Sequence, residues 1–110
     1  MDELKLPEKS GTYRYIVIQI KDELELAIGN SRDSYGDISN VFLRDIKGIS
    51  SDASLENVQF KEIGKGLLDW DYDKEMITFN KENNYTPPSR STIDDLMRGV
   101  DLRYFMTLHN

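Results

Sequence analysis

The sequence of 110 residues contains no cysteine and only one histidine, and these shortages exclude several kinds of site. Without thiols the chain can form neither a disulfide framework nor a thiolate zinc site. The histidine, His109, is the penultimate residue, where chains are usually mobile, whereas a general base must be held within hydrogen-bond reach of its proton. A nucleophile triad is therefore excluded, and we predict no catalytic residue, metal or cofactor.

Long apolar runs are also missing. No stretch approaches the roughly 18 apolar residues that a membrane helix needs, and residues 1–6 have neither the basic nor the apolar region of a secretory signal. We therefore expect a cytoplasmic protein. The net charge of −6, from 20 acids against 14 bases, repels nucleic-acid phosphates and anionic lipids. Direct binding to nucleic acid or to a membrane is not expected.

Length and composition fit one globular domain. The chain is 38% hydrophobic and 31% charged, which is typical of a folded protein. Residues 1–10 are mostly polar and predict a flexible arm, followed by a single α+β domain over residues 11–110. The bias against alanine and towards isoleucine, asparagine, lysine and aspartate is typical of an AT-rich microbial or phage genome.

Hydrophobic periodicity predicts the first half of the domain. The nearly continuous apolar run at 13–20 indicates a strand that is covered on both faces, and the alternation at 24–28 completes a hairpin. Apolar residues then recur at helical spacing over 38–49, with Ser34 or Asp37 available as the N-cap. These patterns predict two strands followed by a helix.

The second half predicts four more strands and another helix. A strand at 55–63 is followed by a break at Gly64-Lys65-Gly66, and a hairpin over 67–79 turns at residues 71–74. Ser91 is the expected cap of a short helix that ends at Gly99, and residues 102–108 alternate as a last strand. The predicted fold is a mixed, mainly antiparallel sheet of about six strands with two helices.

Three aspartates with the spacing of a calcium loop lie in the second hairpin. Asp69, Asp71 and Asp73 could converge on one cation. The glycine that such a loop requires at its sixth position is Lys74, however, and the closing glutamate at its twelfth position is Asn80. The pattern favours a solvated hairpin turn.

The acidic residues are concentrated in the middle of the chain. Residues 52–82 hold eight acids against four bases, a balance of −4, and Tyr72 and Tyr85 fall in predicted loops where aromatic side chains can anchor an interface. These features predict a surface that binds a basic protein, including a nucleic-acid-binding protein. Its expected residues are Asp69, Asp71, Tyr72, Asp73, Glu75, Glu82 and Tyr85.

Several short motifs resemble those of one family. Residues 11–18 are similar to the opening strand of the Janus (Ocnus) family, which includes phosphohistidine phosphatase, and residues 35–38 are similar to the start of its first helix. Residues 63–68, and residues 77–79 together with 85–87, resemble two further family segments in the same order. The resemblance spans about residues 11–105 and implies the family's fold.

The departures from the family pattern bear on function. The resemblance places the family's catalytic histidine at Gly36, or in a one-residue gap beside it, and its phosphate-binding serine near Glu82, whose carboxylate would repel a phosphoryl group. The sequence thus favours a non-catalytic acidic protein-binding module, such as an inhibitor that covers a basic surface. The alternative is a degenerate phosphatase-like protein that binds phosphate or a small molecule through Arg14, Gly36 and Arg90. A third possibility is a structural subunit of a larger assembly. The sequence does not determine the oligomeric state.

Overall fold

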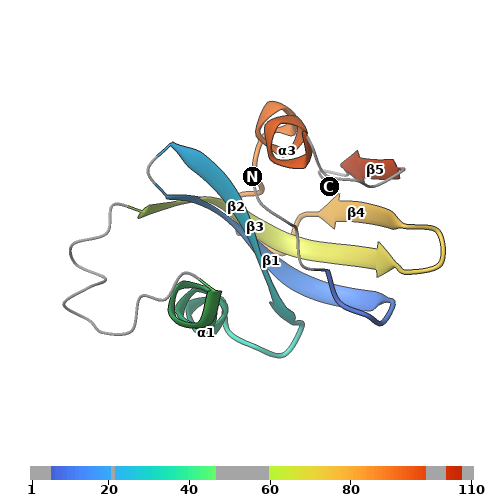
Figure 1. The fold of residues 1–110 in the computed structure, drawn as a ribbon, viewed down its shortest axis with the longest axis horizontal. Helices are drawn as coiled ribbons and strands as arrows, with labels where there is room; N and C mark the ends of the chain where they lie inside the picture. Colours follow the sequence, from blue (N-terminus) through green and yellow to red (C-terminus); the bar gives the residue numbers. More distant parts are fainter. Residues whose placement is uncertain (1–5, 21, 47–59, 99–103, 108–110) are drawn as a thin grey trace.

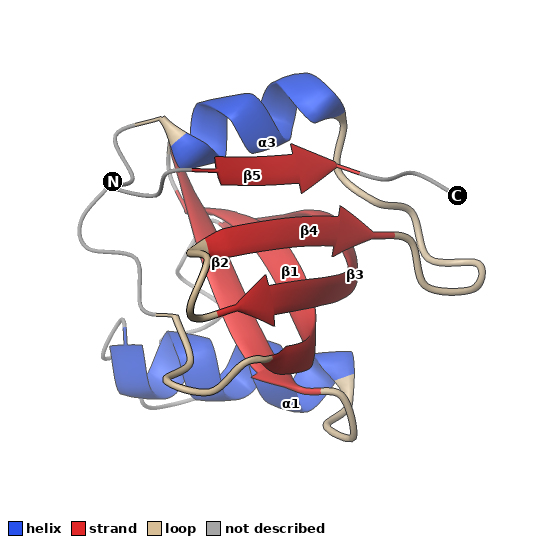
Figure 2. Cartoon of the chain, turned by 90° about the vertical axis from the view of Figure 1, so that its right-hand side faces the viewer, coloured by secondary structure: helices blue, strands red, loops and turns tan. Residues whose placement is uncertain are grey.

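The computed structural model describes residues 6–20, 22–46, 60–98 and 104–107 of the chain. These residues form an α+β fold in which one sheet, in the order β2-β1-β3-β4-β5, lies between helices on its two faces (Figures 1 and 2). The pairs β2–β1, β1–β3 and β3–β4 are antiparallel, and β5 runs parallel to β4. In chain order the elements are β1 (Gly11–Ile20), β2 (Glu23–Asn30), α1 (Tyr35–Val41), its π-helical continuation η1 (Phe42–Ile46), β3 (Phe60–Asp71), β4 (Met76–Asn80), α3 (Arg90–Met97) and β5 (Tyr104–Thr107).

Strand β1 is buried on both faces, as its apolar run predicts. Its residues 15–18 are fully buried. The even-numbered side chains pack under α1 and η1, and the odd-numbered ones pack against α3. The α1 side of the core contains Ile16, Ile18, Ala27, Tyr35, Ile38, Phe42 and Leu43. The α3 side contains Tyr15, Val17, Leu26, Leu68, Trp70, Ile77, Phe79, Ile93, Leu96 and Met97.

The prediction of two strands around residues 64–66 is wrong. A single strand, β3, passes through them, so the described residues form five strands rather than about six. The reason is close packing, because a Cβ on Gly64 would lie 2.7 Å from the Cα of Pro88, and one on Gly66 would meet the carbonyl oxygen of Asn80. Glycine here admits a neighbouring backbone rather than a turn. Residues 55–59 of the predicted strand lie outside the described residues.

The N-cap of α1 was among those predicted, whereas the N-cap of α3 was not. Ser34 caps α1, and its Oγ accepts a hydrogen bond from the amide of Asp37. The cap of α3 is Ser89, whose Oγ accepts from the amide of Thr92, so the prediction of Ser91 is wrong. Ser89 has the extended backbone that a cap requires, and Ser91 already lies in the first turn. Neither helix, within the ranges that the structure describes, has the length and apolarity needed to cross a lipid bilayer.

The second hairpin and the last strand agree with the predicted order. Strand β3 ends at Asp71 and β4 begins at Met76, so the turn lies one residue later than expected. Strand β5 falls inside the predicted range 102–108 and forms the sheet edge beyond β4. The predicted ends of both helices, residues 48–49 and Gly99, lie outside the described residues.

Candidate functional site

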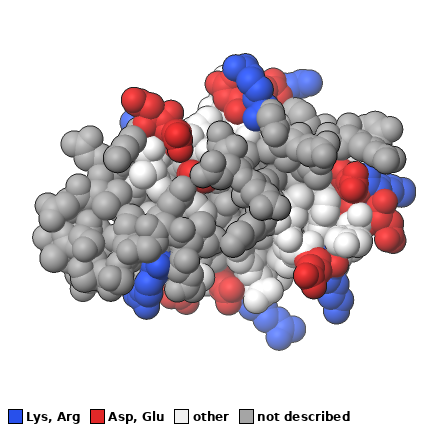
Figure 3. Space-filling view, viewed as in Figure 1, with Lys and Arg blue, Asp and Glu red and all other residues white. Residues whose placement is uncertain are grey.

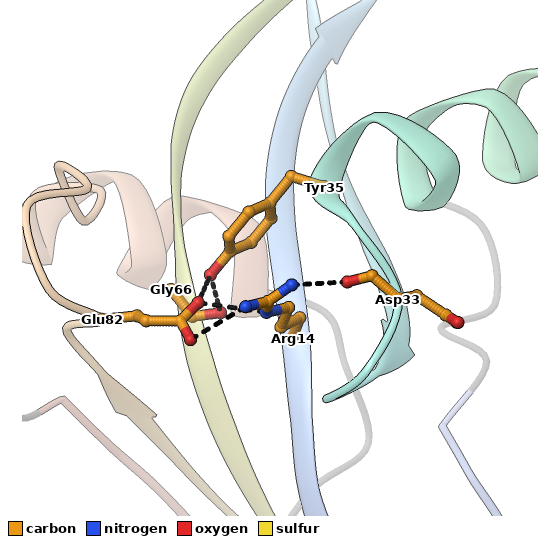
Figure 4. A network of polar contacts seen from close by, with 5 residues as sticks. All are labelled: Arg14, Asp33, Tyr35, Gly66 and Glu82. Carbon is orange, nitrogen blue, oxygen red and sulfur yellow. Dashed lines mark hydrogen bonds and ion pairs between the residues drawn. The ribbon is translucent and has the colours of Figure 1, made fainter.

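A polar cluster lies beside the N-terminal end of α1, where β1 and β3 meet the loop that follows β4 (Figure 4). Arg14 projects from β1, between Gly29 of β2 and Leu67 of β3. The alternation of a strand places Arg14 on the same face as Ile16, which α1 covers. Tyr35 is the first residue of α1 and reaches this face from above. The fold therefore brings the guanidinium of Arg14, on β1, next to the N-terminus of α1.

The guanidinium of Arg14 is bound through all three of its nitrogens. Its Nε donates to Oε1 of Glu82 over 3.1 Å and its Nη2 to Oε2 over 3.3 Å, which makes a bidentate ion pair. Its Nη1 donates to the carbonyl oxygen of Asp33 over 2.7 Å. The two paired side chains are only 24% and 13% exposed. The hydrogen bond with Glu82 raises the pKa of Arg14, so its charge is retained.

Tyr35 completes the cluster as a hydrogen-bond donor. Its hydroxyl donates to Oε1 of Glu82 and also lies 3.1 Å from the carbonyl oxygen of Gly66. Burial raises the pKa of Tyr35 well above its usual value, and the hydrogen bond to Glu82 raises it further. The phenol therefore stays protonated at physiological pH. Glu82 thus accepts hydrogen bonds from two buried or partly buried donors.

Two cations lie over the ring of Tyr35. The guanidinium carbon of Arg14 is 4.9 Å from the ring centroid, and Nζ of Lys65 is 5.2 Å from it. Lys65 is also 4.9 Å from the ring centroid of Tyr85, which packs edge-to-face on Tyr35. The amide of Lys65 donates to the carbonyl oxygen of Thr86 over 3.1 Å. These cation–π and backbone contacts hold the loop after β4 on the surface of β3.

The three residues expected to bind an anion do not form one site. Arg14 lies in the cluster, and Gly36 is exposed next to Tyr35 in the first turn of α1. Arg90 is exposed at the start of α3, the helix that packs on the opposite face of the sheet. Because the carboxylate of Glu82 already binds the guanidinium of Arg14, the position that an anionic ligand would take is filled by the chain itself.

The seven residues expected to bind a partner fall into two groups. Glu82 and Tyr85 belong to the polar cluster described above. The other five belong to the β3–β4 hairpin: Asp69, Asp71, Tyr72, Asp73 and Glu75. Figure 3 shows that, on the face it presents, carboxylates occur at several separate places and alternate with Lys and Arg. The described acidic residues therefore form no single patch on this face.

The turn of the β3–β4 hairpin presents an exposed aromatic ring among carboxylates. Tyr72 is 54% exposed and packs edge-to-face on Trp70, with ring centroids 6.4 Å apart. Residues before β1 support this pair, because Trp70 Nε1 donates to the carbonyl oxygen of Pro7 over 2.8 Å and the amide of Tyr72 donates to Oγ of Ser10 over 2.7 Å. Asp71 caps the turn by accepting from the amide of Lys74. The ring is thus held in place while it faces solvent.

Three members of the polar cluster had no role in the sequence prediction. Tyr35, Lys65 and Asp33 are brought to Arg14 by the order of the strands and by the path of the loop before α1. No local spacing indicates these contacts, which join residues far apart in the chain. Two of the three carried a signal, because Tyr35 opens the motif at residues 35–38 and Lys65 lies in the motif at residues 63–68.

No model of a known protein family matches the chain, and no curated protein sequence matches it. The resemblance to the Janus family is therefore a proposal that rests on the motifs quoted above. Within the described ranges, no three histidine, cysteine, aspartate or glutamate side chains are grouped so that they could hold a metal ion. What the polar cluster offers is a closed ion pair with hydrogen bonds and cation–π contacts around it.

A second buried tyrosine gives a test of the core next to this site. The hydroxyl of Tyr15 is fully buried and has no hydrogen-bond partner among the residues that the structure describes. Burial raises the pKa of Tyr15, so unfolding becomes easier as the pH rises above the usual tyrosine value of 10.0. Tyr15→Phe should therefore leave stability unchanged at pH 7, or raise it by about 1 kcal/mol, and should raise it more at alkaline pH. Urea unfolding at both pH values measures this.

Tyr35→Phe is the matched control for this prediction. It removes the same atom, but from a hydroxyl that donates to Glu82, and should cost about 1–3 kcal/mol at pH 7. Equal losses in the two variants would contradict the assignment of Tyr15 as the hydroxyl without a partner.

Proposed function

We propose that the protein is a non-catalytic acidic module that binds a basic surface of a protein partner through the turn of the β3–β4 hairpin. The observation that carries the proposal is the exposed ring of Tyr72, held by Trp70 and placed between Asp71 and Asp73. Aromatic side chains that are held in place make strong interface anchors. Lysine and arginine side chains can bind both the face of such a ring and neighbouring carboxylates. The hairpin thus fits a basic surface.

The net charge of the chain supports the same kind of partner. A charge of −6 attracts a basic protein over a longer range than the hairpin alone and so raises the rate of association. Salt screens this attraction, with a Debye length of about 8 Å at physiological ionic strength. Binding should therefore weaken as salt is added. An inhibitor that covers a nucleic-acid-binding surface would have this behaviour.

The polar cluster argues against the alternative of a phosphate-binding protein. A phosphate would have to displace Glu82 from Arg14, and the loop that carries Glu82 is also held by Lys65. Saturable protection of the wild-type fold by inorganic phosphate, lost in Arg14→Ala, would support the alternative instead.

The hairpin proposal is tested by removing two charges from the turn. The variant Asp73→Asn with Glu75→Gln should lose most of the binding that the wild type shows in a pull-down from host extract, quantified by mass spectrometry at two salt concentrations. Tyr72→Ala should weaken the same binding without changing its salt dependence, because it removes an anchor and no charge. Asp71 is left in place because it caps the turn.

The control removes the same number of charges elsewhere. Asp94→Asn with Asp95→Asn lies on the exposed side of α3 and should retain binding. A partner captured equally by the hairpin variant and the control would show that net charge, and not the hairpin, governs the interaction.

A further inference from the structure

In the described part of the chain, strand β2 forms one edge of the sheet and β5 forms the other. Strand β2 lies next to β1, and its register with β1 runs without a bulge from Glu23 to Asn30. A regular edge strand of this length, without proline, presents unpaired backbone groups to which another strand can bind. Only the two glutamates, Glu23 and Glu25, place charge on it. The edge of β2 can therefore pair with another strand.

The direction of the backbone groups follows from the end of β2. The amide of Asn30 donates to Oδ2 of Asp33, and its carbonyl oxygen accepts from the amide of the same residue, so both groups point away from β1. Backbone direction alternates along an antiparallel strand. The amides and carbonyls of Leu24, Leu26 and Ile28 therefore point outward too. Among the described residues, none of these six groups has a hydrogen-bond partner.

Only one antiparallel register lets two β2 strands use all three outward residues. It places Leu26 opposite its own copy and Leu24 opposite Ile28 of the other chain. Glu25 then faces Ala27, and Glu23 faces Gly29. Shifting the register by one pair in one direction places Glu25 of one chain opposite Glu25 of the other. Like charges opposite each other destabilise a sheet. The shift in the other direction needs Asn30, which Asp33 already binds.

The neighbouring helix extends this contact. In a continuous sheet with strands about 4.8 Å apart, a twofold axis would pass about 2.4 Å beyond β2. Helix α1 lies over β1 and β2, since Ile38 packs on Gly29 and in the cluster with Ile16 and Ala27. Two copies of α1 would then lie on the same face of the joined sheet, one on each side of this axis. The helix carries Val41, an apolar side chain that is 56% exposed.

We propose that two copies of the chain pair through β2 in this register and form a dimer with one continuous sheet. The sheet order would be β5-β4-β3-β1-β2 in one chain, followed by the reverse order in the other. This pairing leaves the β3–β4 hairpins of both copies at a distance from the joint, since β1 separates β2 from β3. It is therefore independent of the function proposed for the hairpin. Because each chain carries −6, added salt should strengthen the dimer, whereas it should weaken binding to a basic partner.

The absence of native cysteine allows the register to be tested by single substitutions. In the proposed register, residues 25 and 27 of opposite chains form a pair without direct hydrogen bonds, with Cα atoms about 4.5 Å apart, which suits a disulfide. A mixture of Glu25→Cys and Ala27→Cys proteins, mildly oxidised, should give a disulfide-linked dimer. Neither variant alone should give one, because each cysteine then faces a residue without a thiol. Sedimentation equilibrium of the wild type should show a dimer that strengthens with salt.

A second pair of variants guards against a folding defect at buried Ala27. Leu24→Cys mixed with Ile28→Cys should cross-link in the same register, and both positions are only partly buried. Cross-linking of Glu25→Cys alone or of Ala27→Cys alone, as strong as in the mixture, would overturn the register. A wild-type chain that stays monomeric at every concentration, or a dimer that neither mixture can cross-link, would overturn the proposal.

Discussion

Replacing Gly64 by alanine is expected to destabilise the fold by about 3 kcal/mol. The added Cβ would lie 2.7 Å from both the Cα and the Cδ of Pro88, and closer still to its nitrogen. The atoms it meets include backbone, and a fully buried Pro88 has little room to move. The loop would have to lift from β3, which would also strain the bond from the amide of Lys65 to the carbonyl of Thr86. Urea unfolding, followed by the fluorescence of the single tryptophan, measures the loss.

Gly36→Ala is the matched control and should change stability in the opposite direction. A Cβ on Gly36 meets only Oγ of Ser34, at 4.0 Å, and alanine is a better helix former than glycine. A gain of up to about 1 kcal/mol is expected. Gly66→Ala should resemble Gly64→Ala, because its Cβ would meet the carbonyl oxygen of Asn80. Gly64→Ala unfolding at the wild-type midpoint would show that the loop does not rest on β3.

These glycines also show where prediction from the sequence fails. The buried strand at 13–20 and the hairpin turn near Asp71 were predictable because hydrophobic period and turn residues are local signals. The pair Gly64 and Gly66 gives no local signal that separates a turn from a continuous strand. It can mark a turn or the close approach of another backbone, and the segment that approaches Gly64 comes much later in the chain. Two strands were therefore predicted where the structure has one.

The candidate site was predictable in its parts but not in its arrangement. The sequence singled out Arg14 as an anion-binding residue and Glu82 as a partner-binding residue, which are separate and opposite roles. The structure pairs these two residues with each other across 68 positions of sequence. Nothing in their local context indicates that pairing, because it depends on the strand order and on the loop after β4. The β3–β4 hairpin was predictable because its turn is a local signal, whereas the contacts of Trp70 with Pro7 and of Tyr72 with Ser10 were not.

Glu82→Gln should destabilise the protein by about 2 kcal/mol, because it leaves the partly buried charge of Arg14 without its counter-ion. The substitution keeps the volume of the side chain and an oxygen that can still accept from Tyr35, so the loss reports on the ion pair. Chemical unfolding at pH 7 measures it. A double-mutant cycle with Arg14→Gln should show that the two substitutions together cost less than the sum of their separate costs, since the second removes the charge that the first leaves unpaired.

The exposed ion pair between Arg98 and Asp95 provides the control for this prediction. Its atoms are 3.0 Å apart, slightly closer than those of Arg14 and Glu82, but its side chains are 80% and 56% exposed. Asp95→Asn should therefore cost no more than about 0.5 kcal/mol, because solvent and salt screen an exposed pair. If both substitutions had the same small effect, the Arg14–Glu82 pair would be no more than a surface contact. Glu82 would then be free to give way to an anion, and a phosphate site at Arg14 would be favoured.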